Sequence, residues 1–209
     1  MDECTIVVSG FDWFRSSDGR IFYPNPSGVV AEILDNTFVD KCIVKGIVLP
    51  VDFKSLEVLN NLIKKYKPSI VIGLGLHPVA DDPLIELSGF NYGYYRNNSF
   101  IFNDYLYNDS TLSIPIQINF RKLVYYLESI GYSIKLSNTS GLFLCNAVAY
   151  TIYKYSLEYG KPSVFIHIPP VGELRLRLGL SLNTKWSCSL LKNLVIDIII
   201  KYLMLEEIK

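Results

Sequence analysis

The most regular feature of the chain is an alternation of short apolar segments with longer amphipathic ones. The apolar segments are rich in β-branched residues and apolar on both faces, which is typical of strands in a sheet that helices cover on both sides. These predicted strands span residues 5–9, 42–49, 69–74, 115–120, 133–137 and 163–168. The amphipathic segments between them predict helices. The predicted helices span residues 27–34, 55–66, 121–130, 144–159 and about 186–207.

This order of strands and helices predicts an α/β protein. We expect a three-layer α/β/α sandwich with a mostly parallel, mixed central sheet. A length of 209 residues fits one domain of ordinary size, so we expect a single domain over residues 1–209. Irregular segments at residues 12–26, 77–83 and 91–113 are candidate ligand-binding loops, because open α/β sheets bind ligands beyond the carboxyl ends of their strands.

Composition narrows the classes of partner. Basic and acidic residues total 20 each, so the net charge is zero and the chain lacks the basic field that nucleic acids or anionic membranes require. The most apolar stretch, residues 194–205, is interrupted by Asp197 and Lys201 and is shorter than the roughly 20 residues of a membrane span. We therefore expect a buried helix there, with neither nucleic acid nor membrane as a partner.

The first residues carry no pattern of a signal or transit peptide, which predicts a cytoplasmic location. The four cysteines form no CxxC pair, and the two histidines, His77 and His167, are not spaced with them as zinc ligands are. We therefore expect no metal site.

Cys145 is the most suggestive reactive side chain. It follows a predicted strand and begins a long predicted helix, where the helix dipole and free backbone N–H groups lower the pKa of a thiol. The same amides are suited to holding an oxyanion. The alternative is that a cysteine between Leu144 and Ala147 is a small core residue.

His167 lies near the carboxyl end of the next predicted strand. With one strand between them, Cys145 and His167 could face each other over the sheet edge as nucleophile and general base. A histidine flanked by apolar residues is equally compatible with the core. Glu86, an acid in an apolar strand-like run, is a candidate to orient the imidazole, or else an edge-strand carboxylate in solvent. Arg96 is either a surface charge or a partner for a substrate oxygen.

Several fragments together resemble the pyroglutamyl-peptidase I family, also called pyrrolidone-carboxylate peptidases, nearly from end to end. The fragments are Gly-Phe-Asp-Trp-Phe at 10–14, Asn-Pro-Ser at 25–27, Leu-Pro-Val at 49–51, the spacing Glu86, Asn91, Arg96, the S-x-x-x-G-x-x-x-C-N segment at 137–146, and Ile166-His167. The resemblance implies that Cys145 is the nucleophile, His167 the general base and Glu86 the orienting carboxylate. It also implies that Arg96 helps to fix the oxyanion side of the site.

The function implied by this resemblance is removal of an N-terminal pyroglutamyl residue from peptides through a thioester, without metal or organic cofactor. A 5-oxoproline ring is flat and uncharged, so its pocket should be aromatic and apolar. Phe11, Phe14 and Phe143 are the lining candidates, and ordinary core packing is the alternative for each. Two rival functions are a divergent cysteine hydrolase acting on another acyl group and a non-catalytic binding protein.

The chain departs from the family pattern mainly before residue 25. The family usually reads G-F-x-P-F-G-G there, whereas this chain has Trp13 for the proline, Arg15 and Ser16 for the glycine pair, and a longer link. The segment after Arg96 also lacks the usual I-P-D-N continuation. These changes bear on loops near the substrate and leave the three catalytic positions unchanged.

The final predicted helix is apolar on nearly all faces, which requires cover on every side. One sheet covers only one face, so we expect a second subunit to cover the rest, in a homotetramer or dimer as the family resemblance also implies. Cys188, at the start of this helix, either meets its counterpart across a two-fold interface or stays a reduced thiol.

Overall fold

The computed structural model describes residues 4–96, 101–108, 111–138 and 140–206. Its centre is a seven-stranded sheet in the order β12-β7-β13-β6-β1-β5-β4. The strands are β1 Thr5–Phe11, β4 Phe38–Val39, β5 Cys42–Leu49, β6 Ile70–Leu76, β7 Leu84–Glu86, β12 Lys135–Ser137 and β13 Ser163–Ile168. Neighbours from β13 through β6 and β1 to β5 are parallel, whereas β7 runs antiparallel to β13 and β4 antiparallel to β5. The predicted mixed, mostly parallel sheet is confirmed.

The central strands are buried on both faces. Every residue of β1, β6 and β13 is buried, as the unbroken apolar runs in the sequence predict for strands that helices cover on both sides. The core therefore forms two layers, one above and one below these strands.

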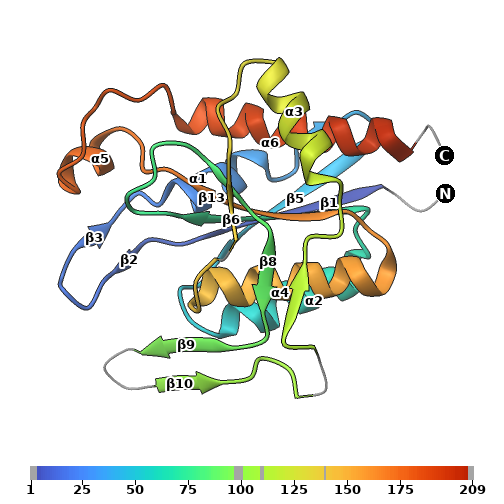
Figure 1. Cartoon of the computed structure of the whole chain (residues 1–209), viewed down its shortest axis with the longest axis horizontal. Helices are drawn as coiled ribbons and strands as arrows, with labels where there is room; N and C mark the ends of the chain where they lie inside the picture. The colour runs from blue at the N-terminus through green and yellow to red at the C-terminus, as the bar shows by residue number, and fades with distance from the viewer. Residues whose placement is uncertain (1–3, 97–100, 109–110, 139, 207–209) are drawn as a thin grey trace.

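Helices cover both faces of the sheet (Figure 1). On one face α1 (Pro26–Leu34) packs on β1 and β5 and against α6 (Cys188–Glu206), and α3 (Phe120–Ser129) packs on α6. On the other face α2 (Lys54–Tyr66) packs against α4 (Leu144–Tyr159), which lies on β6 and β13. A short helix, α5 (Glu173–Arg177), follows β13. The α/β/α layering is confirmed.

Among the residues that the structure describes, three two-stranded ribbons lie outside the main sheet. They pair β2 (Phe14–Arg15) with β3 (Ile21–Phe22), β8 (Ser88–Phe90) with β11 (Ser113–Pro115), and β9 (Gly93–Arg96) with β10 (Ile101–Asp104). The expected strand over residues 115–120 is wrong: the extended segment ends at 115, and α3 begins at 120. Asn119 explains this start, because its side chain accepts a hydrogen bond from the Lys122 N–H and caps the helix.

Helix α6 has one fully buried face and one partly exposed face within a single chain. Leu191, Leu194, Val195, Ile198 and Ile199 are at most 1% exposed within one chain. These positions form one stripe along the helix, which α1, α3 and β4 contact, whereas Leu190, Ile196 and Ile200 are partly exposed. The expectation that a second subunit covers the rest of the helix stays a prediction. In the described part of the chain, no helix combines the length and apolar character needed to cross a bilayer.

A disulfide joins Cys4 to Cys42 at the beginning of β1 and β5. The two strands are parallel, with Thr5 opposite Ile43, so the two cysteines are also opposite one another. The bond lies at the amino ends of these strands.

Candidate active site

His167 and Glu86 face each other on the neighbouring strands β13 and β7. Nδ1 of His167 is 2.6 Å from Oε1 of Glu86, and the side chains of both residues are buried. The possibility that Glu86 is a solvent-exposed edge carboxylate is therefore excluded. An Nδ1–H donated to this carboxylate fixes the imidazole tautomer and leaves Nε2 for a second partner.

That second partner is Cys145, which hydrogen bonds to His167. Cys145 lies in the first turn of α4, after Phe143 at the N-cap. Gly75, on β6 opposite His167, makes room for the contact: a Cβ at this position would lie 2.8 Å from Sγ of Cys145 and 3.1 Å from Cδ2 of His167. The structure thus brings the three predicted catalytic side chains together.

The three side chains are also coupled electrostatically. Burial, the strongest influence on His167, lowers the pKa of its imidazole. The Cys145 sulfur, by charge and hydrogen bond, and the Glu86 carboxylate raise it, and together they set the pKa at about 9. At neutral pH His167 is therefore an imidazolium held between two groups that stabilise its positive charge.

The segments that carry the triad are anchored by further hydrogen bonds. The Tyr153 hydroxyl donates to the carbonyl oxygen of Glu86 and accepts from the backbone N–H of Phe165 at 3.1 Å, so it links β7 to β13. Asn146, next to Cys145, accepts from the N–H of Phe90 at 2.8 Å and donates to the carbonyl oxygens of Phe90 and Tyr92. These bonds fix the start of α4 relative to the segment that follows Glu86.

The first turn of α4 places backbone N–H groups next to the thiol. Phe143 at its N-cap offers no side-chain hydrogen bond to the helix, so the amides beside Cys145 are not occupied by a capping side chain. Backbone N–H groups in this position suit an anionic oxygen.

The aromatic candidates for a substrate pocket occupy three different environments. Phe11 belongs to the main core and is 4% exposed. Phe14 stacks on Phe22 at 4.4 Å in a separate apolar cluster with Leu76 and Leu174. Phe143 is 60% exposed, and its ring contacts that of Tyr94 beside the start of α4. Arg96 ends β9, but its side chain lies outside the described residues.

One residue at this site was not singled out for a catalytic role by its sequence pattern. The ring of His77, directly after β6, lies 5.6 Å from the ring of His167, edge to face. The only signal in the sequence is its place just beyond a buried strand in an irregular segment. Its nearness to His167 depends on the pairing of β6 with β13.

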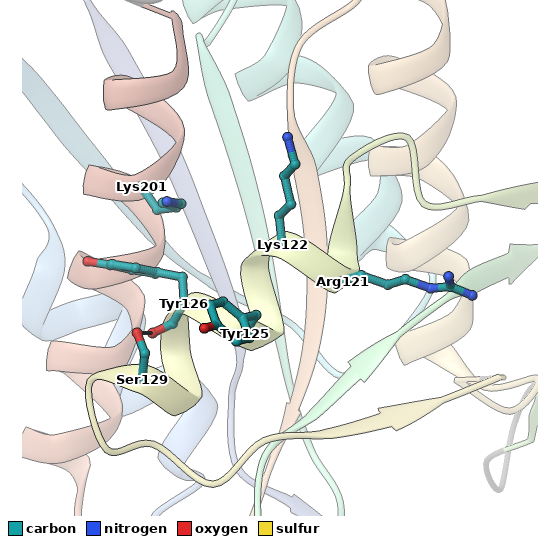
Figure 2. Close-up of a pocket in the computed structure, with 6 residues that line it drawn as sticks. All are labelled: Arg121, Lys122, Tyr125, Tyr126, Ser129 and Lys201. Atoms are coloured by element: carbon teal, nitrogen blue, oxygen red, sulfur yellow. Dashed lines mark hydrogen bonds between the residues drawn. The ribbon is translucent and has the colours of Figure 1, made fainter.

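A hollow of about 520 Å³ lies away from the triad, between α3 and α6. Its lining residues are Arg121, Lys122, Tyr125, Tyr126, Ser129 and Lys201. Figure 2 shows Arg121 and Lys122 extending away from Tyr126 and Lys201, so the cations do not converge on one point. No group of three or more His, Cys, Asp or Glu side chains in the described residues is placed to hold a metal ion.

A sequence model of the family described as pyroglutamyl peptidase matches residues 4–177. The chain belongs to the pyroglutamyl peptidase family. The matched region contains Glu86, Cys145 and His167, and it ends before α6.

Individual relatives agree with the family. Pyrrolidone-carboxylate peptidase 1 of Saccharolobus solfataricus is 30% identical over 174 residues, 79% of this chain and 78% of the relative. The pyrrolidone-carboxylate peptidase of Pyrococcus furiosus is 30% identical over 175 residues, 80% of this chain and 82% of the relative.

Solved structures share the fold. The pyrrolidone carboxyl peptidase from Thermococcus litoralis superposes with a TM-score of 0.85 at 23% identity, covering 99% of this chain and 96% of that one. A variant of the Pyrococcus furiosus pyrrolidone carboxyl peptidase gives a TM-score of 0.83 at 27% identity, covering 96% and 98%. Because these matches cover nearly the whole chain, the likeness includes α6.

Proposed function

We propose that the protein removes an N-terminal pyroglutamyl residue from peptides, with Cys145 as nucleophile, His167 as acid and base, and Glu86 as the carboxylate that orients His167. Membership of the pyroglutamyl peptidase family supports the substrate class. The observation that carries the mechanism is the burial of His167 between the Cys145 sulfur and the Glu86 carboxylate.

In the first half of the reaction the Cys145 thiolate attacks the carbonyl carbon of the pyroglutamyl residue and forms a carbon–sulfur bond. Negative charge develops on the carbonyl oxygen, and the backbone N–H groups at the start of α4 stabilise it. The carbon–nitrogen bond then breaks as His167 gives its proton to the departing amine. The products are a thioester on Cys145, the shortened peptide and a neutral His167.

In the second half a water molecule attacks the thioester carbonyl while neutral His167 takes its proton. The carbon–sulfur bond breaks, pyroglutamic acid leaves, and the thiolate and imidazolium are restored. Throughout this cycle Glu86 accepts the Nδ1–H of His167, which keeps Nε2 directed at the reacting atoms.

The substrate side of the site is part of the same proposal. The exposed ring of Phe143 beside Cys145 and the apolar rings of Phe11 and Phe14 suit the flat, uncharged 5-oxoproline ring. Arg96 would act on the oxyanion side. No metal or organic cofactor takes part in these steps.

We further propose one catalytic domain over residues 1–209 that assembles as a homotetramer or dimer in the cytoplasm. Strands between residue 5 and residue 168 form one sheet. Helix α6 packs against α1 on one face of this sheet. Partly exposed apolar residues on α6, Ile196 and Ile200, offer a contact to another copy. A reducing compartment keeps the Cys145 thiol free. Because disulfides are rare in reducing compartments, the Cys4–Cys42 bond is the feature of the chain that fits a cytoplasmic location least.

A substrate panel tests this function. We expect wild type to hydrolyse a pyroglutamyl chromogenic amide far faster than prolyl or free-amino aminoacyl amides, Cys145→Ala to be inactive, and Cys188→Ala, which removes the other free thiol, to match wild type. Preference for another acyl amide would support a divergent hydrolase. Wild type without thiol-dependent turnover would support a binding protein. Either result would contradict the proposal.

A further inference from the structure

His77 continues the line of residues that faces the catalytic thiol. It follows β6 directly, and its backbone N–H donates to the carbonyl oxygen of Ile168 at 3.0 Å, one step beyond the pair Leu76 and Ile168. Side chains alternate between the two faces of a strand. Because a side chain at Gly75 would point at Cys145, the side chain at position 77 lies on the same face, one step nearer the carboxyl end of the sheet.

The His167 ring is contacted by aromatic rings on two sides. Phe165, two residues earlier on β13, lies 5.2 Å away at an interplanar angle of 81°. His77 lies 5.6 Å away at 79°. Phe165 therefore packs on the inner side of the imidazole, and His77 packs on the side toward the carboxyl ends of the strands, where ligands enter an open α/β sheet.

His77 is suited to this place only while it is uncharged. Burial first, and then the positive charge of His167, lower the pKa of His77, and the Glu86 carboxylate opposes them in part. Its half-buried ring has a buried Nδ1 with no hydrogen-bond partner among the described residues. A neutral ring excludes water from His167 without repelling it, whereas a protonated ring would place a second positive charge beside it.

We propose that His77 is a positioning residue of the active site, whose neutral ring packs on the outer side of His167 and holds the imidazole in line with Glu86 and Cys145. The proposal rests on the function proposed above. His77 acts through His167 and takes no part in making or breaking bonds.

In the described part of the chain, the ionisable groups near His77 and His167 come from four elements and one loop. Glu86 on β7 and Cys145 on α4 face His167. In the loop that carries His77, Asp81 is bonded to Arg175 of α5, and Asp82 accepts from Trp186 and pairs with Lys135. The charged groups of that loop are thus already engaged with partners, so protonation of His77 adds a new positive charge on this side of His167.

Three variants test whether His77 positions the His167 ring or only fills space. We expect His77→Ala to lower kcat about tenfold with little change in KM, because misplacing a catalytic group costs rate more than binding. His77→Phe keeps a ring of similar width and should recover most of kcat. Leu157→Ala, at an exposed position near the end of α4, should match wild type. Circular dichroism and thermal unfolding show whether each variant folds. Wild-type kcat in a folded His77→Ala, or a loss confined to KM, would overturn the proposal.

The pH profile and the reactivity of the thiol give a second, independent readout. Wild type should lose activity on acidification at a higher pH than His77→Phe, by about one pH unit, because only wild type gains a charge at position 77. The rate of iodoacetamide labelling of Cys145 should show the same difference without any substrate. If wild type fails to hydrolyse the pyroglutamyl amide but labelling still differs, only the proposed function fails. Superimposable labelling profiles would overturn the role of His77.

Discussion

Glu86 and His167 form a buried hydrogen bond of 2.6 Å between two antiparallel strands of the sheet. Because this hydrogen bond is buried, it fixes the orientation of the His167 ring. The Glu86 side chain is 1% exposed, so the carboxylate meets little water, and the imidazole is the partner that compensates its charge.

Replacing this carboxylate tests how much orientation contributes. Glu86→Gln keeps the shape but removes the charge, so we expect kcat to fall by about two orders of magnitude or more, and by less than in Cys145→Ala or His167→Ala, which remove groups that take part in bond making. Glu128→Gln, at an exposed position of α3, is the matched control. Wild-type kcat in Glu86→Gln would remove Glu86 from the site.

The alkaline side of the activity profile reports the proton on His167. Its pKa is raised to about 9, so the imidazolium persists through neutral pH and is lost as the pH rises through that value. We expect kcat/KM to fall above pH about 9 because the leaving amine then lacks its proton donor. In Glu86→Gln the fall should come at lower pH, since the carboxylate is one of the groups that raise this pKa. If the alkaline fall of kcat/KM came at the same pH in wild type and Glu86→Gln, Glu86 would not raise the pKa of His167.

Gly75→Ala tests the closeness of Cys145 and His167. The added methyl group would lie 2.8 Å from Sγ of Cys145 and push the two side chains apart, so we expect kcat to fall about tenfold or more. In Gly73→Ala, on the same strand, the added methyl group would meet Phe165 and Ile152 first and would reach His167 only through the Phe165 ring. A smaller loss in Gly73→Ala is expected. Equal losses would show that general crowding of the strand, and not this contact, is responsible.

The Cys4–Cys42 bond should affect stability and leave catalysis unchanged. It closes a loop of 38 residues, for which chain entropy gives a stabilisation of about 4 kcal/mol as an upper value. We expect Cys4→Ser with Cys42→Ser to unfold at lower temperature with unchanged kcat. Cys188→Ser serves as the control for loss of a thiol. An unchanged unfolding temperature would argue against the bond.

Assembly is tested by light scattering at micromolar concentration. We expect an oligomer for wild type and smaller species for Ile196→Asp with Ile200→Asp, which change the partly exposed face of α6. Ile199→Asp is unsuitable, because Ile199 is fully buried within one chain and a charge there would unfold it. A monomeric wild type would contradict the proposed assembly.

Much of the fold follows directly from the apolar pattern. The strand at 163–168 and the helix at 144–159 have the predicted bounds, because long runs with one periodicity leave little ambiguity. The predicted strand at 115–120 has only a weak alternation of isoleucines and begins with a proline, which cannot donate to a ladder. The strands β2 and β3, in which Phe14 pairs with Phe22, have only two residues each. Tertiary contacts, and not the local sequence pattern, determine strands this short.

The site divides in the same way. Cys145 and His167 stand at element ends that the sequence indicates, and the family resemblance points to Glu86. The contact of His77 with His167 and the bond from Cys4 to Cys42 depend on how strands are paired side by side. The spacing of residues in the sequence does not specify which strands pair or in which register. A shift of one residue in the register would turn each side chain of a strand to the other face of the sheet.

The central claim is that Cys145 is the nucleophile of pyroglutamyl hydrolysis. The most direct measurement follows inactivation by iodoacetamide while peptide mass mapping records the labelling of Cys145 and Cys188, the free thiols. The account predicts that hydrolysis of the pyroglutamyl amide disappears at the rate at which Cys145 is labelled, with Cys188 lagging behind. Activity that is lost while Cys145 is still unlabelled, or that survives its complete labelling, would contradict the account.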